Sequence, residues 1–326
     1  MVSNTEIKYA FEAANVHKSI SKELNNIVKP GAKLSDIANF IENTTKERIK
    51  YDPNNPLKAG IGFPTSLSVN EIVAHFTPSS LNKDYVLKKN DIIKVDYGVQ
   101  KEGFIIDSAL TFNFNEKYDE FTKISKNLTN YGVSLCGPDA VLGDIGSDIE
   151  EYIKSKEITI DGKTHQLTTI GDLSGHNIGK YVIHNSKAVP NKAIYYPVRM
   201  EVGEFFAVEP FITTGDGHIY YDDPTNLYMI NKKLPSLKEL NDDELKLFKY
   251  LRKKYLTLCF CDRWLDNELD LEYKPYKRNL NNLIKKKFIE KYPTIYDKKG
   301  NLSSQFEHTI YINEKGVINL TKNDLY

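Results

Sequence analysis

Residues 91–112, DIIKVDYGVQKEGFIIDSALTF, have the alternating pattern of a β-hairpin with one aspartate on each strand. If the turn centres on Lys101 and Glu102, Asp96 pairs directly with Asp107, while the opposite face of both strands is mostly apolar. Side chains paired in this way have Cβ atoms about 4.5–5.5 Å apart. Two carboxylates that close repel each other unless a cation or a shared proton lies between them, and hard divalent cations prefer oxygen ligands. The hairpin therefore predicts a metal site, with two exposed acids on an edge hairpin as the alternative.

The composition disfavours several classes of protein. Of the 326 residues, 40% are hydrophobic and 27% are charged, which is typical of a soluble globular protein. Lysine plus arginine and aspartate plus glutamate both number 44, and this balance disfavours a broad nucleic-acid-binding surface. There is no apolar run of the signal-peptide type and no stretch near the roughly 18 apolar residues of a membrane span. We therefore expect a cytoplasmic protein with no membrane partner and no specific nucleic-acid partner.

The three cysteines do not suggest a disulfide framework. Cys136, Cys259 and Cys261 cannot all pair with one another. Cys259 and Cys261 lie in the apolar stretch LTLCFCDRW, so we expect them to be buried free thiols.

Helical periodicity appears in two stretches of the first half of the chain. One covers most of the first fifty residues, and the other runs from about residue 118 to residue 154. Gly143 and Gly146 lie inside the second stretch, where we expect them to break it into two helices.

Extended segments follow each helical stretch. Asp161-Gly162 is a strong signal for a second hairpin, and residues 171–185 and 203–215 are extended in pattern. Because helices followed by antiparallel strands occur twice, the sequence predicts an α+β fold built of two similar halves, with a site between them. We expect residues 1–326 to form a single domain.

A helical insertion interrupts the second half of the chain at about residues 223–293. Asn241 and Glu244 have the spacing of a capping box at the start of one of its helices. The run Lys285-Lys286-Lys287 predicts a solvated helix face, because the zero net charge of the chain disfavours the alternative of DNA binding.

Four further polar residues lie on segments that we expect to be buried. His176 and His184 are eight positions apart, so an unbroken strand would direct both to one side. Glu209 and Glu307 each interrupt an apolar strand, and a buried carboxylate needs a partner. Taken singly, a lone histidine is more often a structural residue, and a lone glutamate on a strand more often lies at an exposed edge. Convergence with the two aspartates would instead supply ligands for two metal ions about 3.5–4 Å apart.

Five of these six residues, all except His184, resemble in order and in context the five metal ligands of the methionine aminopeptidases, which have the pita-bread fold. The matching strings include GFPTS, DIIKVDYG, SGHNIGKYVIH, MEVGEFFAVEPF and QFEHTI. The helical insertion is similar to that of the type 2 enzymes. The ligand positions in this chain are Asp96, Asp107, His176, Glu209 and Glu307.

The resemblance implies a catalytic domain that holds two divalent metal ions, which could be Mn, Co, Fe or Zn. Asp96 would bind one ion, and His176 and Glu209 would bind the other. Asp107 and Glu307 would bridge both ions. Glu209 would also carry a proton from the nucleophile to the leaving amine.

The resemblance also assigns the substrate site. His75 would contact the substrate and is the residue that epoxide inhibitors alkylate, and His184 would hydrogen-bond the scissile carbonyl. Leu227 departs from the family pattern, in which a histidine usually precedes the Tyr-Met pair. The pocket for the methionine side chain would be lined by Phe63, His75, Leu173, Ile183, His184, Leu227, Tyr292 and Ile295.

The implied reaction is removal of the initiator methionine from nascent polypeptides and peptides whose second residue is small. Nascent N-termini would be the partners of a monomeric enzyme, and some members of the family also engage ribosomes. Two alternatives share the fold. An Xaa-Pro peptidase usually carries a sizeable preceding domain, and non-catalytic binding homologues lose ligands that this chain keeps.

Overall fold

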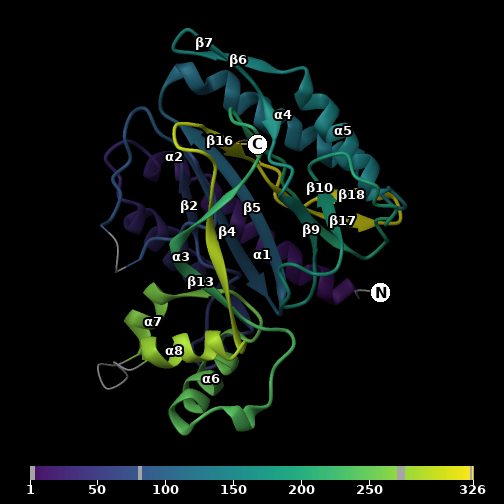
Figure 1. Cartoon of the computed structure of the whole chain (residues 1–326). Helices are drawn as coiled ribbons and strands as arrows, with labels where there is room; N and C mark the ends of the chain where they lie inside the picture. The colour runs from purple at the N-terminus through teal and green to yellow at the C-terminus, as the bar shows by residue number, and fades with distance from the viewer. Residues whose placement is uncertain (1–3, 80–82, 270–275, 324, 326) are drawn as a thin grey trace.

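Two antiparallel sheets form the centre of the fold, and helices cover each of them (Figure 1). The computed structural model describes residues 4–79, 83–269, 276–323 and 325. In the first half, α1 packs on β4 and β5 and also contacts α3. Its elements are α1 (Asn4–Ser21), α2 (Leu24–Ile27), α3 (Leu34–Ile49), β1 (Ala59–Ile61), β2 (Ser66–Val69), β3 (Ile72–Ala74), β4 (Ile92–Lys101) and β5 (Phe104–Asn113).

The second half repeats this arrangement, since α4 and α5 pack on a sheet of order β10-β9-β11-β17-β18. The predicted α+β architecture is therefore confirmed. The helices and main strands are α4 (Asp119–Leu135), α5 (Leu142–Lys154), β9 (Ser174–Ile178), β10 (Ala188–Pro190), β11 (Phe205–Val208), β17 (His308–Asn313) and β18 (Gly316–Asn319). A smaller sheet joins β8 (Thr168–Thr169), β12 (Phe211–Thr213) and β16 (Ser303–Gln305).

The central hairpin forms as predicted, but its register differs. The turn lies at Glu102 and Gly103, whose φ angles of +50° and +84° fit the type I′ turn that two-residue hairpins favour. As a result Asp96 faces Ala109 and Gly98 faces Asp107, so the predicted direct pairing of the two aspartates is wrong. The register moved by two positions, which preserves the alternation of faces. Asp96 and Asp107 therefore remain diagonal neighbours on one face.

Gly98 is required where it faces Asp107. A Cβ atom there would lie 2.5 Å from the ring of Phe63, which packs directly over the strand. No larger residue fits without displacing that ring.

The second hairpin confirms its prediction, with β6 (Glu157–Ile160) and β7 (Lys163–Gln166) joined at Asp161-Gly162. The predicted helix break at Gly143 and Gly146 is wrong, because both lie inside α5 and the break falls at residues 136–141. A Cβ atom on either glycine would come within 3 Å of a backbone oxygen, at 2.8 Å from Tyr196 and 2.6 Å from Lys192. Close packing of the helix against this backbone explains the two glycines.

A separate lobe of helices extends from the sheets at the bottom of Figure 1. It has its own buried apolar cluster, and the capping box of Asn241 and Glu244 is confirmed. Strands continue further into this segment than predicted, since β13 runs to Ile230 and β15 begins at Ile289. The elements are β13 (Tyr220–Ile230), α6 (Asp242–Tyr255), β14 (Phe260–Cys261), α7 (Asp262–Glu268), α8 (Tyr276–Lys285) and β15 (Ile289–Tyr296). Because β15 also pairs with β3, this lobe joins the first half immediately before His75.

Among the helices that the structure describes, none combines the length and apolar character needed to cross a membrane.

Candidate metal centre

The five predicted metal ligands come together where the two halves of the fold meet. Their side chains form the cluster that we call the candidate metal centre. The first half supplies Asp96 from β4 and Asp107 from β5. The second half supplies His176 from β9, Glu209 from the link between β11 and β12, and Glu307 from the link between β16 and β17.

The distances within the centre are short. His176 Nε2 lies 3.5 Å from Asp107 Oδ2 and 3.4 Å from Glu209 Oε1. One ligand atom each of Asp107, His176 and Glu307 lies within 4.8 Å of the others, in a fully buried group. Gln305 Nε2 donates to Glu209 Oε2 at 3.0 Å and to Glu307 Oε2 at 3.4 Å. Gln305 therefore fixes two of the carboxylates relative to each other.

The electrostatics of the centre are unfavourable for the protein alone. Burial and the charge of Asp107 raise the pKa of Asp96, Glu209 and Glu307 well above the usual carboxyl range. In addition, four buried atoms have no hydrogen-bond partner among the described residues: Asp96 Oδ1, Asp107 Oδ1, Glu307 Oε1 and His176 Nδ1. Such orphaned groups are costly. Carboxylate oxygens with one imidazole are a donor set that divalent cations accept, so the residues present fit bound metal ions.

Two further histidines flank the centre, as the sequence predicted. His75 follows β3 with φ +66°, and its Nδ1 lies 3.3 Å from the carbonyl oxygen of Pro293. The ring of His184 meets that of His176 edge-on with centroids 4.3 Å apart. The ring of Tyr292 lies 5.9 Å from that of His75 and 5.8 Å from that of His184. Burial lowers the pKa of both His75 and His184, which keeps both rings neutral near pH 7.

The proximity of His176 and His184 has a different cause from the one predicted. The strand does not continue between them, because β9 ends at Ile178. The chain instead folds back, with the Asn185 amide donating to the Asn177 carbonyl at 3.0 Å.

A cavity of about 60 Å³ lies against the metal centre. Most of the predicted pocket residues line it: Phe63, His75, Ile183, His184, Leu227 and Tyr292. Leu173 lines an outer cleft of about 330 Å³ that shares His75, His184 and Glu209 with the inner cavity. Ile295 lines neither, because it pairs with Ala74 on β3 and packs behind it with Val73 and Phe211.

Several residues of the site were not predicted. The cavity wall also includes Pro64, Ser66, Ala74, Phe211 and Cys259. Cys259 is a buried free thiol, as expected, and burial raises its pKa to about 12. Only Gln305 carried a detectable signal, since it precedes Glu307 by two positions and a strand would direct both to the same face.

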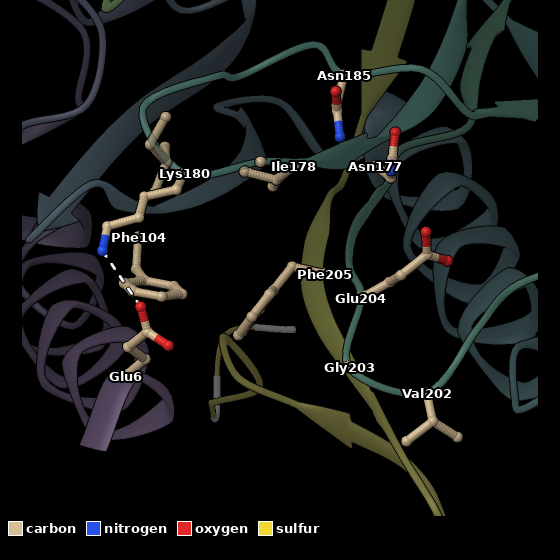
Figure 2. Close-up of a pocket in the computed structure, with 12 residues that line it drawn as sticks. Glu6, Phe104, Asn177, Ile178, Lys180, Asn185, Val202, Gly203, Glu204 and Phe205 are labelled. Atoms are coloured by element: carbon tan, nitrogen blue, oxygen red, sulfur yellow. Dashed lines mark hydrogen bonds and ion pairs between the residues drawn. The ribbon is translucent and has the colours of Figure 1, made fainter. Parts of the chain in front are cut away.

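A larger hollow of about 440 Å³ lies beside the last residues of β9, and its charged groups are already paired (Figure 2). Lys180 Nζ meets Glu6 Oε1 at 3.2 Å, and Lys187 Nζ meets Glu204 Oε1 at 2.8 Å. None of the orphaned buried atoms found among the described residues belongs to its lining. The chemistry therefore concentrates in the smaller cavity, beside the candidate metal centre.

Comparisons with known proteins agree with this geometry. The model of metallopeptidase family M24 matches residues 9–236. Methionine aminopeptidase 2 of Dictyostelium discoideum is 39% identical over 319 residues, which cover 96% of this chain and 70% of that protein. Among solved structures, a thermophilic Arx1 superposes with a TM-score of 0.80 at 18% identity, covering 100% of this chain and 94% of that one. A methionine aminopeptidase from Thermotoga maritima gives a TM-score of 0.66 at 21% identity, with 98% of each chain covered. The structural matches confirm the predicted pita-bread fold.

Proposed function

Because this chain belongs to metallopeptidase family M24, and within it to the methionine aminopeptidase 2 group, we propose that it removes N-terminal methionine by metal-dependent hydrolysis. The observation that carries the proposal is the buried candidate metal centre, whose orphaned oxygens adjoin a small and mostly apolar cavity. The similarity to a methionine aminopeptidase 2 does not favour the alternative of an Xaa-Pro peptidase.

We assign two divalent ions to the centre. Asp96 would hold one, His176 and Glu209 the other, and Asp107 and Glu307 both. Ions bound there would supply Lewis acidity, which polarises a carbonyl and makes a bound water more acidic. The crowding of carboxylates supports this assignment, because cations would remove the repulsion that raises the pKa of Asp96, Glu209 and Glu307.

The neighbouring side chains have separate tasks. His184 is neutral and has an N–H to donate, so it can stabilise negative charge on the scissile carbonyl oxygen. Glu209 lies at the boundary of the inner cavity and the outer cleft, where it can pass a proton to the leaving amine. His75 lines both spaces and limits the room for the second residue of the substrate.

The cavity explains a preference for methionine. Phe63, Ile183, Leu227 and Tyr292 give it apolar walls, and a thioether needs little hydrogen bonding. Leu227 makes this wall more apolar than the histidine of the family pattern would. The substrates would be nascent polypeptides with a small second residue. We propose a monomeric enzyme that acts in the cytoplasm, with the ribosome as a further partner.

A peptide assay tests the proposal. We expect turnover of Met-Ala-Ser with added divalent metal, little turnover of a Met-Leu peptide, and loss of activity with a chelator. Cleavage of an Ala-Pro dipeptide in place of Met-Ala-Ser would indicate the Xaa-Pro peptidase. Absence of any metal-dependent cleavage would support a non-catalytic homologue.

A further inference from the structure

Glu42 on α3 is a buried carboxylate with a full set of hydrogen-bond donors. Its side chain is 4% exposed. Arg263 donates to it from Nη1 at 2.9 Å and from Nη2 at 2.7 Å. Trp264 Nε1 donates at 2.7 Å, and the backbone amide of Thr65 donates at 3.2 Å. We call these four residues the Glu42 cluster.

The partners of Glu42 lie close in sequence to residues from two separate walls of the inner cavity. Thr65 follows Phe63 and Pro64, which line the cavity from the loop between β1 and β2. Arg263 and Trp264 begin α7 in the helical lobe, a few residues after the wall residue Cys259. One carboxylate therefore holds together two walls that are about 200 residues apart in sequence.

A third segment of the site is tied to the same group. Arg263 Nε donates to the carbonyl oxygen of Pro78 at 3.2 Å, and Pro78 lies three residues after His75. On the far side of the loop, the ring of Phe63 packs on Gly98 with no space between them. A shift of the loop would therefore move Phe63 relative to both the metal-bearing strand and the lobe.

We propose that Glu42, Arg263 and Trp264 are positioning residues that set the width of the methionine pocket by holding the Phe63 loop against the helical lobe. The proposal rests on the proposed function for its substrate, but the geometry it describes can be measured without activity. Breaking hydrogen bonds of the Glu42 cluster would widen the pocket. It would also weaken the preference for methionine over other side chains at the first residue of the substrate. We expect metal binding to be unaffected, because none of the hydrogen bonds described for the Glu42 cluster involves a residue of the candidate metal centre.

Three variants test the proposal. Glu42→Gln keeps the shape but replaces one acceptor oxygen with a donor, which opposes the donors around it. Trp264→Phe is milder, because it removes a single donor and leaves the Glu42–Arg263 ion pair. Glu244→Gln is the matched control: Glu244 is a 1% exposed glutamate in the same lobe that accepts from Lys286 and Asn282, and it does not line the cavity.

The first readout is selectivity. We expect Glu42→Gln to raise KM for Met-Ala-Ser about tenfold with a smaller change in kcat, and to narrow the preference for Met over Leu or Phe as first residue. Trp264→Phe should change the same quantities in the same direction but less. Calorimetric titration should show unchanged metal binding in both variants.

The second readout is the reactivity of Cys259, which needs no substrate. Its thiol lines the cavity and is buried, so a maleimide should label it slowly in the unmodified protein, as measured by mass spectrometry of digests. We expect both Glu42→Gln and Trp264→Phe to accelerate this labelling, with Cys136 as an internal reference.

The outcomes separate the two proposals. If the unmodified protein does not cleave N-terminal methionine, the proposed function is overturned. The labelling of Cys259 would still decide the role of the Glu42 cluster in that case. Equal selectivity and equal labelling in Trp264→Phe and unmodified protein would overturn the positioning role. So would equal changes in Glu244→Gln, because they would show a general loss of stability.

Discussion

The Glu42 cluster and the candidate metal centre are two buried acidic sites with opposite solutions to the same physical problem. Glu42 accepts four hydrogen bonds and has a guanidinium partner. At the metal centre, three carboxylate oxygens and one imidazole nitrogen have no partner in the part of the chain that the structure describes. Removing a carboxylate from water is costly in both places. The comparison shows that burial alone does not reveal function, whereas several unpartnered carboxylate oxygens gathered around one imidazole indicate a site for cations.

The largest expected effect is at the metal centre. Asp107→Asn should abolish turnover and weaken the binding of both metal ions, because the proposed role of Asp107 is to bridge them. Asp96→Asn should mainly weaken the binding of one ion. Isothermal titration with a divalent metal measures the binding of the ions in both variants. Glu42→Gln is the control, because we expect it to bind metal as the unmodified protein does. Full binding of two ions by Asp107→Asn would contradict the assignment.

The same comparison predicts opposite effects on the stability of the metal-free protein. Glu42→Gln should lower the free energy of unfolding by about 3–5 kcal/mol, because it leaves the Arg263 guanidinium buried without its counter-charge. Asp107→Asn should raise it, since it removes one of several repelling carboxylates. Urea unfolding in the presence of a chelator measures both changes. A loss of stability in Asp107→Asn as large as that in Glu42→Gln would remove the distinction between the two sites.

A smaller effect is expected next to the metal centre. His184→Ala should cost about 2.7–4 kcal/mol in the activation barrier, with kcat lowered more than KM is raised, because the hydrogen bond from His184 strengthens as the carbonyl becomes an oxyanion. Steady-state kinetics on Met-Ala-Ser separates the two constants. An increase in KM at unchanged kcat would instead assign His184 to substrate binding alone.

The two hairpins show what the sequence could and could not predict. Asp161-Gly162 is a favoured type I′ dipeptide, and that turn was placed correctly. Glu102 has the same positive φ, but glutamate gives no such signal, so the turn of the central hairpin was misplaced by one residue. The alternation of the strands still placed Asp96 and Asp107 on one face.

Tertiary contacts explain the remaining differences. Gly143 and Gly146 were interpreted as a helix break, because the sequence does not show the backbone that packs against them in α5. Cys259 lines the cavity because β14, which follows it directly, pairs with β13 at the wall residue Leu227, and the sequence does not show this pairing. The predicted ligands were easier to identify, since each is a polar residue in or beside a predicted strand and lies within a string that resembles the family.

The smallest predicted effect concerns His17 on α1, a buried group whose partners are all neutral. Its ring stacks on that of Tyr97 at 4.0 Å, and its Nε2 lies 3.2 Å from the Tyr97 carbonyl oxygen. Burial lowers the pKa of His17 from 6.5 to about 3. Among the described residues, no acid contributes to the pKa shift of His17. This site therefore differs from both acidic sites, because it excludes charge altogether.

The sign of the pH dependence follows from this shift. Below pH 6.5 the unfolded chain binds a proton at His17, whereas the folded protein does not bind it until the pH approaches about 3. The free energy of unfolding therefore decreases as the pH falls from 6.5 towards about 3. At pH 5 the loss amounts to about 2 kcal/mol. His17→Gln cannot take up this proton, so its free energy of unfolding should fall less between pH 7 and pH 5, by about that amount. Urea unfolding of chelator-treated protein at both pH values measures the difference, with His165→Gln on the β6–β7 hairpin as the control for loss of a histidine as such. An equal fall in His17→Gln and unmodified protein would mean that the folded protein accommodates the imidazolium, and that burial without a counter-charge does not keep this site neutral.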